Sequence, residues 1–252
     1  MARENRRSVV ITGASTGIGH ACALHLDALG FRVFAGVRRE ADGDSLRRQA
    51  SDRLTPLILD VTDEATIEAA SEHVHQAMGD AGVSGLVNNA GIAIGGPLEL
   101  IQLDDLRRQL EVNVIGQVAV TQAFLPLLRH GRGRIVNMGS ISGRVAGPFV
   151  GPYAASKFAM EALTDSLRLE LRPWGVHVAI VEPGVIATPI WEKSLSTAQD
   201  MLERLPAERR QRLETLYGSA MDRMRLATQG MSTRGVSPVA VARAVEHALV
   251  SP

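Results

Sequence analysis

Tyr153 and Lys157 are four residues apart in the stretch GPYAASKF, where the chain leaves a Gly- and Pro-rich segment. On a helix this spacing places two side chains on one face, within reach of a shared partner. A lysine near a phenol favours the phenolate, so we expect the pKa of Tyr153 to be lowered towards neutrality. Such a tyrosine can donate and accept protons near neutral pH, as general acid–base catalysis requires. The pair alone does not exclude the alternative, an exposed lysine beside a half-buried tyrosine.

A glycine-rich stretch, TGASTGIG, follows the first apolar run and contains Gly13, Gly17 and Gly19. Glycines at such a turn let the backbone approach a diphosphate closely, and the diphosphate then faces the positive end of the next helix. Close packing of a helix on a strand accounts for Gly19 but not for all three glycines. The stretch therefore predicts a dinucleotide site.

Short apolar runs alternate with longer segments of helical periodicity. The predicted strands are 8–12, 32–37, 55–60, 85–88, 134–138 and 176–182, and the predicted helices are 17–29, 64–78, 103–129, 153–172 and 239–250. Runs such as VVIT and HVAIV lack polar alternation, which is typical of parallel strands buried on both faces. The alternation predicts an α/β fold, a doubly wound parallel sheet in one domain spanning residues 1–252.

Residues 189–237 carry no strand signal. Leucines and methionines recur at helical intervals on both sides of Pro206, so we expect two amphipathic helices inserted before the last helix. Their apolar residues can roof a large pocket as a lid, and the alternative is a helical pair that thickens the core. The candidate lid residues are Trp191, Leu195, Met201, Leu205, Leu216, Tyr217, Met221 and Met224.

Composition excludes several classes of partner. The chain has 27 basic residues (lysine and arginine) and 27 acidic residues (aspartate and glutamate), so no net charge attracts nucleic acid. A single cysteine, Cys22, fits a reducing compartment. The basic N-terminal stretch has too short an apolar run for a secretion signal, and no membrane-spanning run is expected. No His, Cys and carboxylate cluster has metal-ligand spacing, so we expect a cytoplasmic protein without a metal.

Seven motifs in order resemble the short-chain dehydrogenase/reductase family: TGASTGIG, LDVTD, NNAG, EVNVIG, NMGS, YAASK and PGVIAT. The resemblance covers residues 9 to 188, and the start of the insert, TPIWEKS, resembles the steroid- and retinoid-handling branch. It implies a single-domain Rossmann fold with strand order 3-2-1-4-5-6, binding NAD or NADP. The family's seventh strand is doubtful here, either absent or not included in the sequence. Gly139–Ser140 replaces the family's usual serine pair and leaves the catalytic position intact.

The resemblance also implies roles for individual residues. Tyr153 would be the general acid/base, Lys157 its activator and a ribose ligand, Ser140 a donor to the substrate oxygen, and Asn113 the holder of a relay water. Asp60 and Val61 would meet the adenine, and the residues after Pro183 the nicotinamide. The implied cofactor-binding residues are Gly13, Ser15, Thr16, Gly17, Ile18, Gly19, Arg38, Arg39, Asp60, Val61, Asn89, Ala90, Gly91, Tyr153, Lys157, Pro183, Gly184, Val185, Ile186 and Thr188.

The cofactor preference depends on the end of the second strand. NAD-specific members carry an acid there, whereas this chain has Val37 followed by Arg38 and Arg39. An arginine at this point can pair with the 2′-phosphate of NADP, and the alternative is two solvated loop arginines. We therefore expect NADP, with NAD as the alternative.

The predicted function is an NADP(H)-preferring oxidoreductase that interconverts a secondary alcohol and a ketone on an apolar, steroid- or retinoid-like substrate. The alternatives are a non-catalytic NAD(P)-binding regulator of the same fold and a membrane-surface protein anchored by the inserted helices. The helices 103–129 and 153–172 resemble those that pair across a two-fold axis in dimers of the family. Their apolar residues on two sides suit such pairing, so we expect a homodimer, with a tetramer as the alternative.

Overall fold

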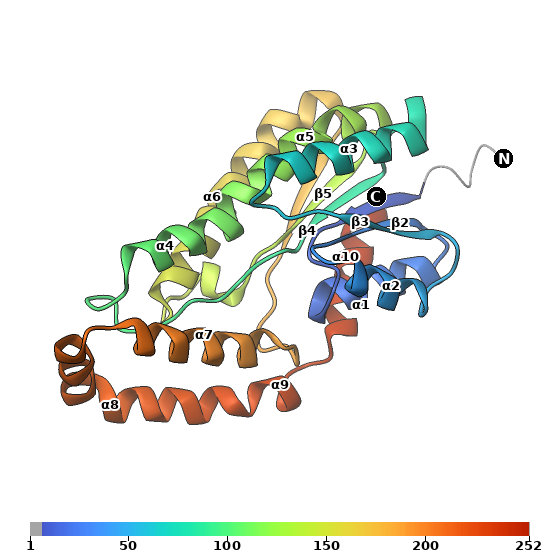
Figure 1. Cartoon of the computed structure of the whole chain (residues 1–252). Helices are drawn as coiled ribbons and strands as arrows, with labels where there is room; N and C mark the ends of the chain where they lie inside the picture. Colours follow the sequence, from blue (N-terminus) through green and yellow to red (C-terminus); the bar gives the residue numbers. More distant parts are fainter. Residues whose placement is uncertain (1–6, 252) are drawn as a thin grey trace.

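Six parallel strands form the central sheet of the computed structural model, which describes residues 7–251 (Figure 1). The strands are β1 (Ser8–Ile11), β2 (Arg32–Val37), β3 (Leu54–Ile58), β4 (Gly85–Asn88), β5 (Arg134–Met138) and β6 (His177–Val181). They pair in the order β3-β2-β1-β4-β5-β6, which confirms the prediction. Residues 1–6, part of the stretch weighed as a secretion signal, lie outside the described range.

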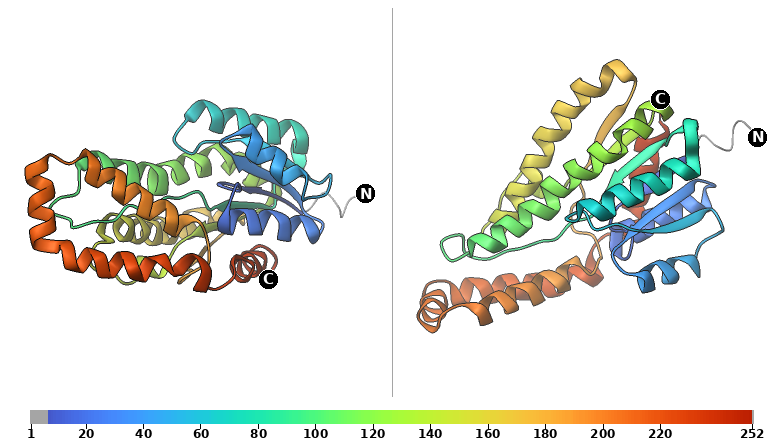
Figure 2. Two further views of the ribbon diagram at one scale, coloured as in Figure 1. Left: turned by 60° about the horizontal axis from the view of Figure 1, so that its bottom comes forward. Right: turned by 45° about the horizontal axis from the view of Figure 1, so that its top comes forward.

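Helices cover both faces of the sheet, because successive strand residues point to opposite faces and both sets are apolar. Val9 and Ile11 of β1 pack towards α1 (Gly17–Ala28), α2 (Glu40–Arg47) and α10 (Pro238–Val250). Val10, between them, packs towards α3 (Glu64–Met78), α5 (Gly116–Gly131) and α6 (Gly151–Leu171). Figure 2 shows the two helical layers on either side of the sheet. The sequence prediction missed α2, which buries only Gly43 and Leu46 and so has little apolar periodicity.

The predicted helix 103–129 is interrupted. It consists of α4 (Leu103–Leu110), a π-helical turn (Glu111–Ile115) and α5. By length and composition alone, Leu103–Gly131 could cross a membrane. Val120, Phe124 and Leu128 are fully buried in the core on one face of the sheet, as in a core helix. The expectation that the chain has no membrane span stays a prediction.

The insert forms a helical hairpin of α7 (Ile190–Arg204) and α8 (Ala207–Gln229), followed by the short α9 (Met231–Arg234). The hairpin lies beyond the carboxyl ends of the strands (Figure 1). Its two ends meet: the amide of Val236 donates to Val185 O, and the amide of Ala187 donates to Val236 O, both at 2.9 Å. The two predicted helices are confirmed, and they leave and rejoin the domain at one point.

Candidate active site

One cavity of about 1470 Å³ lies at the carboxyl ends of the strands, between the sheet and the hairpin. Ligands of doubly wound sheets bind at this edge, where the crossovers on either side of β1 diverge. Gly19, Arg39 and Asn113 are the predicted site residues that do not line the cavity. The predicted residues that do line it are Gly13, Ser15, Thr16, Gly17, Ile18, Arg38, Asp60, Val61, Asn89, Ala90, Gly91, Ser140, Tyr153, Lys157, Pro183, Gly184, Val185, Ile186 and Thr188.

The glycine-rich turn between β1 and α1 needs its glycines for two reasons. Gly13 and Gly17 have φ values of 66° and 61°, a left-handed conformation that favours glycine. A Cβ on Gly19 would lie 2.3 Å from the carbonyl oxygen of Gly13, and one on Gly13 would lie 2.8 Å from Cα of Ala90. Gly19 therefore closes the turn from behind rather than facing the cavity.

The turn presents the start of α1 to the cavity. Thr16 precedes the helix without a side-chain cap, and no acidic residue lies in the first turn. Free amide groups and the positive end of the helix dipole therefore face the cavity, where they suit a diphosphate. The donor set fits a dinucleotide cofactor.

Asn89 locks this turn to the loop after β4. Its Nδ2 donates to Thr12 O at 2.9 Å and to Gly13 O at 3.1 Å. The hydroxyl of Thr12 accepts from the amides of Asn89 and Ala90, both at 3.0 Å. The side chain of Asn89 therefore fixes the shape of the cradle.

The two arginines after β2 have different surroundings. Arg38 lines the cavity. Arg39 points away and donates from Nε and Nη2 to the carboxylate of Asp42, both at 3.0 Å. The prediction that both arginines face the cofactor is therefore wrong for Arg39, whose guanidinium pairs within the first turn of α2.

Ser140, Tyr153 and Lys157 gather at the cavity floor, from the end of β5 and the first turns of α6. Burial raises the pKa of Tyr153, and a hydrogen bond with the side chain of Ser140 opposes this shift. The expected lowering is therefore not found, because burial of the phenol outweighs the opposing bond. Lys157 Nζ donates to Met138 O at 2.6 Å.

Lys157 is nevertheless close to the phenol: its Nζ lies 5.7 Å from the centre of the Tyr153 ring. The side chain is buried, and burial lowers the pKa of the amine to about 8, while Glu161 opposes the shift. The ammonium form still dominates at neutral pH, so a positive charge lies beside the ring.

Asn113 lies behind the site, in the π-helical turn. Its Oδ1 accepts from the amide of Ile92 at 2.9 Å, and its Nδ2 donates to Ile92 O at 3.0 Å and to Ser156 Oγ at 3.1 Å. The side chain thus ties the loop after β4 to α6. Its predicted role in holding a relay water stays a prediction.

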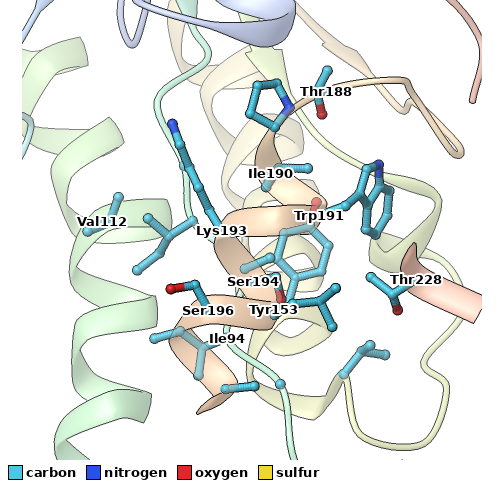
Figure 3. A pocket seen from close by; sticks show the side chains of 18 of the residues that line it. Ile94, Val112, Tyr153, Thr188, Ile190, Trp191, Lys193, Ser194, Ser196 and Thr228 are labelled. Carbon is cyan, nitrogen blue, oxygen red and sulfur yellow. The ribbon is translucent and has the colours of Figure 1, made fainter. Parts of the chain in front are cut away.

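The first turns of α7 supply two side chains with hydrogen bonds that the sequence patterns did not predict. Lys193 Nζ donates to Thr16 Oγ1 at 3.4 Å, which brings a cation to the glycine-rich turn. Trp191 Nε1 donates to Ile186 O at 2.7 Å and so fixes α7 to the loop after β6. Figure 3 shows these side chains extending to opposite sides of α7, with Tyr153 nearby. Lys193 lies in the stretch TPIWEKS, but its pairing with Thr16 could not be predicted, because the two residues are 177 positions apart in the sequence.

The hairpin forms the far end of the cavity, where apolar side chains lie among charged ones such as Arg210, Glu214 and Asp222. Trp191, Leu195, Met221 and Met224 line it, as predicted for a lid. Met201 and Leu205 are buried beneath the lining, and Leu216 is 55% exposed, so the proposed lid role of Leu216 is wrong. The ring of Tyr217 contacts that of Phe149 edge-on, with centroids 6.0 Å apart.

A latch holds the hairpin tip to α4. Arg204 Nη2 lies 3.1 Å from Oδ1 of Asp105, whose side chain is only 5% exposed. The other oxygen of Asp105 has no hydrogen-bond partner within residues 7–251. Removing Arg204 therefore leaves a buried carboxylate with neither oxygen paired to a cation.

Comparisons with known proteins agree with this geometry. Residues 7–199 match the family described as short chain dehydrogenase. The 3-amino-tetrahydro-pyrrolizinone reductase of Xenorhabdus hominickii is 43% identical over 214 residues, covering 84% of this chain and 73% of the relative. Retinol dehydrogenase 5 of Mus musculus is 42% identical, covering 84% of this chain and 66% of the relative. The 17-beta-hydroxysteroid dehydrogenase type 6 of Bos taurus is 41% identical, covering 96% of this chain and 77% of the relative.

Solved structures give the same result. A short chain dehydrogenase/reductase from Burkholderia phymatum in complex with NAD has a TM-score of 0.79 at 27% identity, covering 96% of this chain and 85% of that one. A short-chain dehydrogenase from Streptomyces avermitilis has a TM-score of 0.77 at 29% identity, with 97% and 84% covered.

Proposed function

This chain belongs to the short-chain dehydrogenase family, whose members oxidise CH–OH groups or reduce the corresponding carbonyl groups, and we propose that it interconverts an apolar, retinoid- or steroid-like alcohol and its ketone with NADP(H). The observation that carries the proposal is the placement of Ser140, Tyr153 and Lys157 on the floor of a cavity that is roofed by the hairpin, whose lining includes Trp191, Leu195 and Met221.

Several residues support binding of the dinucleotide. The uncapped start of α1 faces the diphosphate position, and Lys193 adds a positive charge beside Thr16. When bound, the nicotinamide ring would supply or accept the hydride, while the protein orients the substrate and moves a proton. Arg38 supports the choice of NADP, since it lines the cavity and can pair with a 2′-phosphate.

The proton is handled by the chain's own side chains. During reduction, negative charge grows on the carbonyl oxygen, and the hydroxyl groups of Ser140 and Tyr153 can both donate to it. Tyr153 then transfers its proton to that oxygen, and the ammonium of Lys157 stabilises the phenolate that remains. Oxidation of an alcohol uses the same steps in reverse.

The hairpin supports an apolar substrate. Its lining side chains include Trp191, Leu195 and Met221, and three relatives are named for retinol, a steroid or a pyrrolizinone. Figure 3 shows Ile190 and Trp191 of α7 beside Tyr153, with Ile94 and Val112 contributed by other segments. A rigid polycyclic or polyene body fits such a lining better than a charged one.

Assembly as a homodimer in the cytoplasm completes the proposal. Ile115 in the π-helical turn and Phe158 on α6 are 54% and 44% exposed, on segments that pack together. Apolar side chains on this outer layer support pairing of two copies. The free thiol of the buried Cys22 supports a reducing compartment.

A cofactor-absorbance assay with NADPH and NADH against retinoid, steroid and simple ketones tests the function. We expect turnover of apolar ketones with NADPH, and loss of this turnover in Tyr153→Phe. Binding of NADPH without turnover of any carbonyl or alcohol would instead favour a non-catalytic regulator.

A further inference from the structure

A group of charged side chains lies directly behind Lys157. Glu161 is one turn further along α6 and is only 9% exposed. Arg144 bridges two carboxylates: its Nη2 lies 3.1 Å from Glu161 Oε2, and its Nε donates to Glu182 Oε1 at 2.6 Å. Glu182 follows β6, so the group joins α6, β6 and the segment after Ser140.

The carboxylate of Glu161 is inserted beneath the turn that carries Ser140. A Cβ on Gly139 would lie 3.2 Å from Glu161 Oε1, and a Cβ on Gly143 would lie 3.0 Å from it. This oxygen has no hydrogen-bond donor among the described residues. Glycines on both sides of Ser140 thus leave room for a buried carboxylate. Burying an uncharged side chain at this point would cost less free energy.

The charges around Glu161 explain its ionisation. Its pKa is raised to about 7, first by burial and then by a hydrogen bond with Glu182, while Arg144 opposes the shift and Asp165 on α6 adds to it. The pKa of Glu182 is lowered, chiefly because Arg144 donates a hydrogen bond to it. Glu161 therefore carries the proton of this carboxyl pair and becomes ionised near neutral pH.

The second neighbour of Glu161 is Lys157. Burial lowers the pKa of the Lys157 amine to about 8, and the charge of Glu161 acts in the opposite direction. Glu161 ionises near pH 7, so its negative charge is present in the range where Lys157 starts to lose its proton. The two groups therefore titrate in succession within one buried site.

We propose that Glu161 is a positioning residue, which keeps Lys157 protonated beside Tyr153 from its place between Arg144, Glu182 and the glycines that flank Ser140. Its effect on the amine is supported by the burial of both side chains and their four-residue spacing on α6, whereas its effect on turnover rests on the proposed function. An uncharged side chain at position 161 would let Lys157 lose its proton at lower pH.

The sequence offers a direct measurement, because Lys157 and Lys193 are its only lysines. In protein labelled at the lysine ε-carbon, NMR titration follows both amines, and Lys193→Arg leaves only the Lys157 signal. We expect Glu161→Gln to lower the pKa of Lys157 by about one unit, the lower end of the range for a nearby opposite charge. Glu170→Gln, an exposed change on the same helix, is the control and should leave that pKa unchanged.

Turnover provides the second readout. For ketone reduction, the alkaline limb of the kcat profile should move to lower pH in Glu161→Gln by the same amount, and Glu161→Asp should restore part of the shift. If Glu161→Gln does not fold, Arg144→Gln replaces it, because Arg144 is 58% exposed and its loss leaves Glu161 less ionised. Arg144→Gln should lower both the pKa of Lys157 and the pH of the alkaline limb of the kcat profile, by less than Glu161→Gln does.

The outcomes separate the two proposals. An unchanged Lys157 titration in these variants overturns the role of Glu161, whatever the activity. A shifted titration in a protein that turns over no substrate supports that role and overturns the proposed function.

Discussion

Lys157 donates a hydrogen bond from Nζ to the backbone carbonyl of Met138, 2.6 Å away. Met138 ends β5, two residues before Ser140, so the amine is fixed against the same strand end that positions the serine. An ammonium has three hydrogens, and this bond uses one, which leaves two for a cofactor hydroxyl and the phenol. The sheet therefore sets the position of the amine, and Tyr153 can be altered without displacing it.

Replacing the phenol should separate chemistry from binding. We expect Tyr153→Phe to lower kcat by about 10²–10⁴-fold, since it removes the proton donor, while the Kd of the cofactor stays close to wild type. Lys157→Ala should impair both quantities. Steady-state kinetics and fluorescence titration with NADPH measure them, and a Tyr153→Phe enzyme with near wild-type kcat would contradict the assignment.

Arg38 and Arg39 form a matched pair for testing cofactor choice. Only Arg38 lines the cavity, and Arg39 is held by Asp42. Arg38→Ala should lower the ratio of NADPH to NADH affinity by about 10- to 100-fold, the value of a charge-assisted hydrogen bond. Arg39→Ala should leave the ratio unchanged. Equal ratios in wild type and Arg38→Ala would show that another group decides the preference.

The latch between Arg204 and Asp105 should control opening of the hairpin. Arg204→Ala removes the cation from a buried carboxylate, at a cost of about 1–3 kcal/mol or more for a charged group. Hydrogen exchange should therefore become faster in α7 than in wild type, and NADPH with substrate should slow it. Arg209→Ala, at an exposed position on α8, is the control. Slow exchange in α7 of every protein would identify the hairpin as part of the core.

Stability should depend on pH through Glu161. Its folded-state pKa, about 7, lies above the ordinary value of 4.5, so the native state binds more protons than the unfolded state between these pH values. The contribution of this bound proton to the free energy of unfolding is fully present below pH 4.5 and is lost as the pH rises through 7. The Tm of Glu161→Gln, relative to wild type, should therefore rise between these pH values. A constant Tm difference would mean that the carboxyl titrates normally.

The outer layer of helices should hold two copies together. Sedimentation equilibrium at micromolar concentration should give a dimer, and Phe158→Glu should shift it towards monomer because it places a charge in the proposed interface. Leu226→Glu, at a residue on α8 that is 66% exposed, is the control. A wild-type monomer would refute the interface, and a tetramer would require a second one.

The strands and the motifs could be predicted because both depend on local patterns, and the resemblance that these motifs carry implied the strand order and most of the cavity lining. Buried parallel strands are continuous apolar runs, and the glycine-rich turn and the YAASK stretch are short motifs at fixed offsets. The π-helical turn at Glu111–Ile115 could not be predicted, because Leu103–Gly131 has one uninterrupted helical pattern.

The other differences depend on contacts between distant residues. Arg39 turns away from the cavity because Asp42 lies within its reach, and the role of Lys193 depends on a partner at Thr16. The predicted direction of the pKa shift of Tyr153 was wrong because the spacing of Tyr153 and Lys157 can be read from the sequence, whereas the burial of the phenol cannot.

The hydrogen bonds that join Val236 to Val185 and Ala187 hold the two ends of the hairpin side by side, so the hairpin is one exchangeable segment. Its two ends are held together independently of its length, so a hairpin from a relative could be transplanted between them without moving Tyr153 or the glycine-rich turn. Gly235 must be kept in such a chimaera, since a Cβ there would lie 2.5 Å from the amide nitrogen of Ala187. Substrate range could thus be exchanged between relatives by swapping one continuous segment, with the proton-transfer residues left in place.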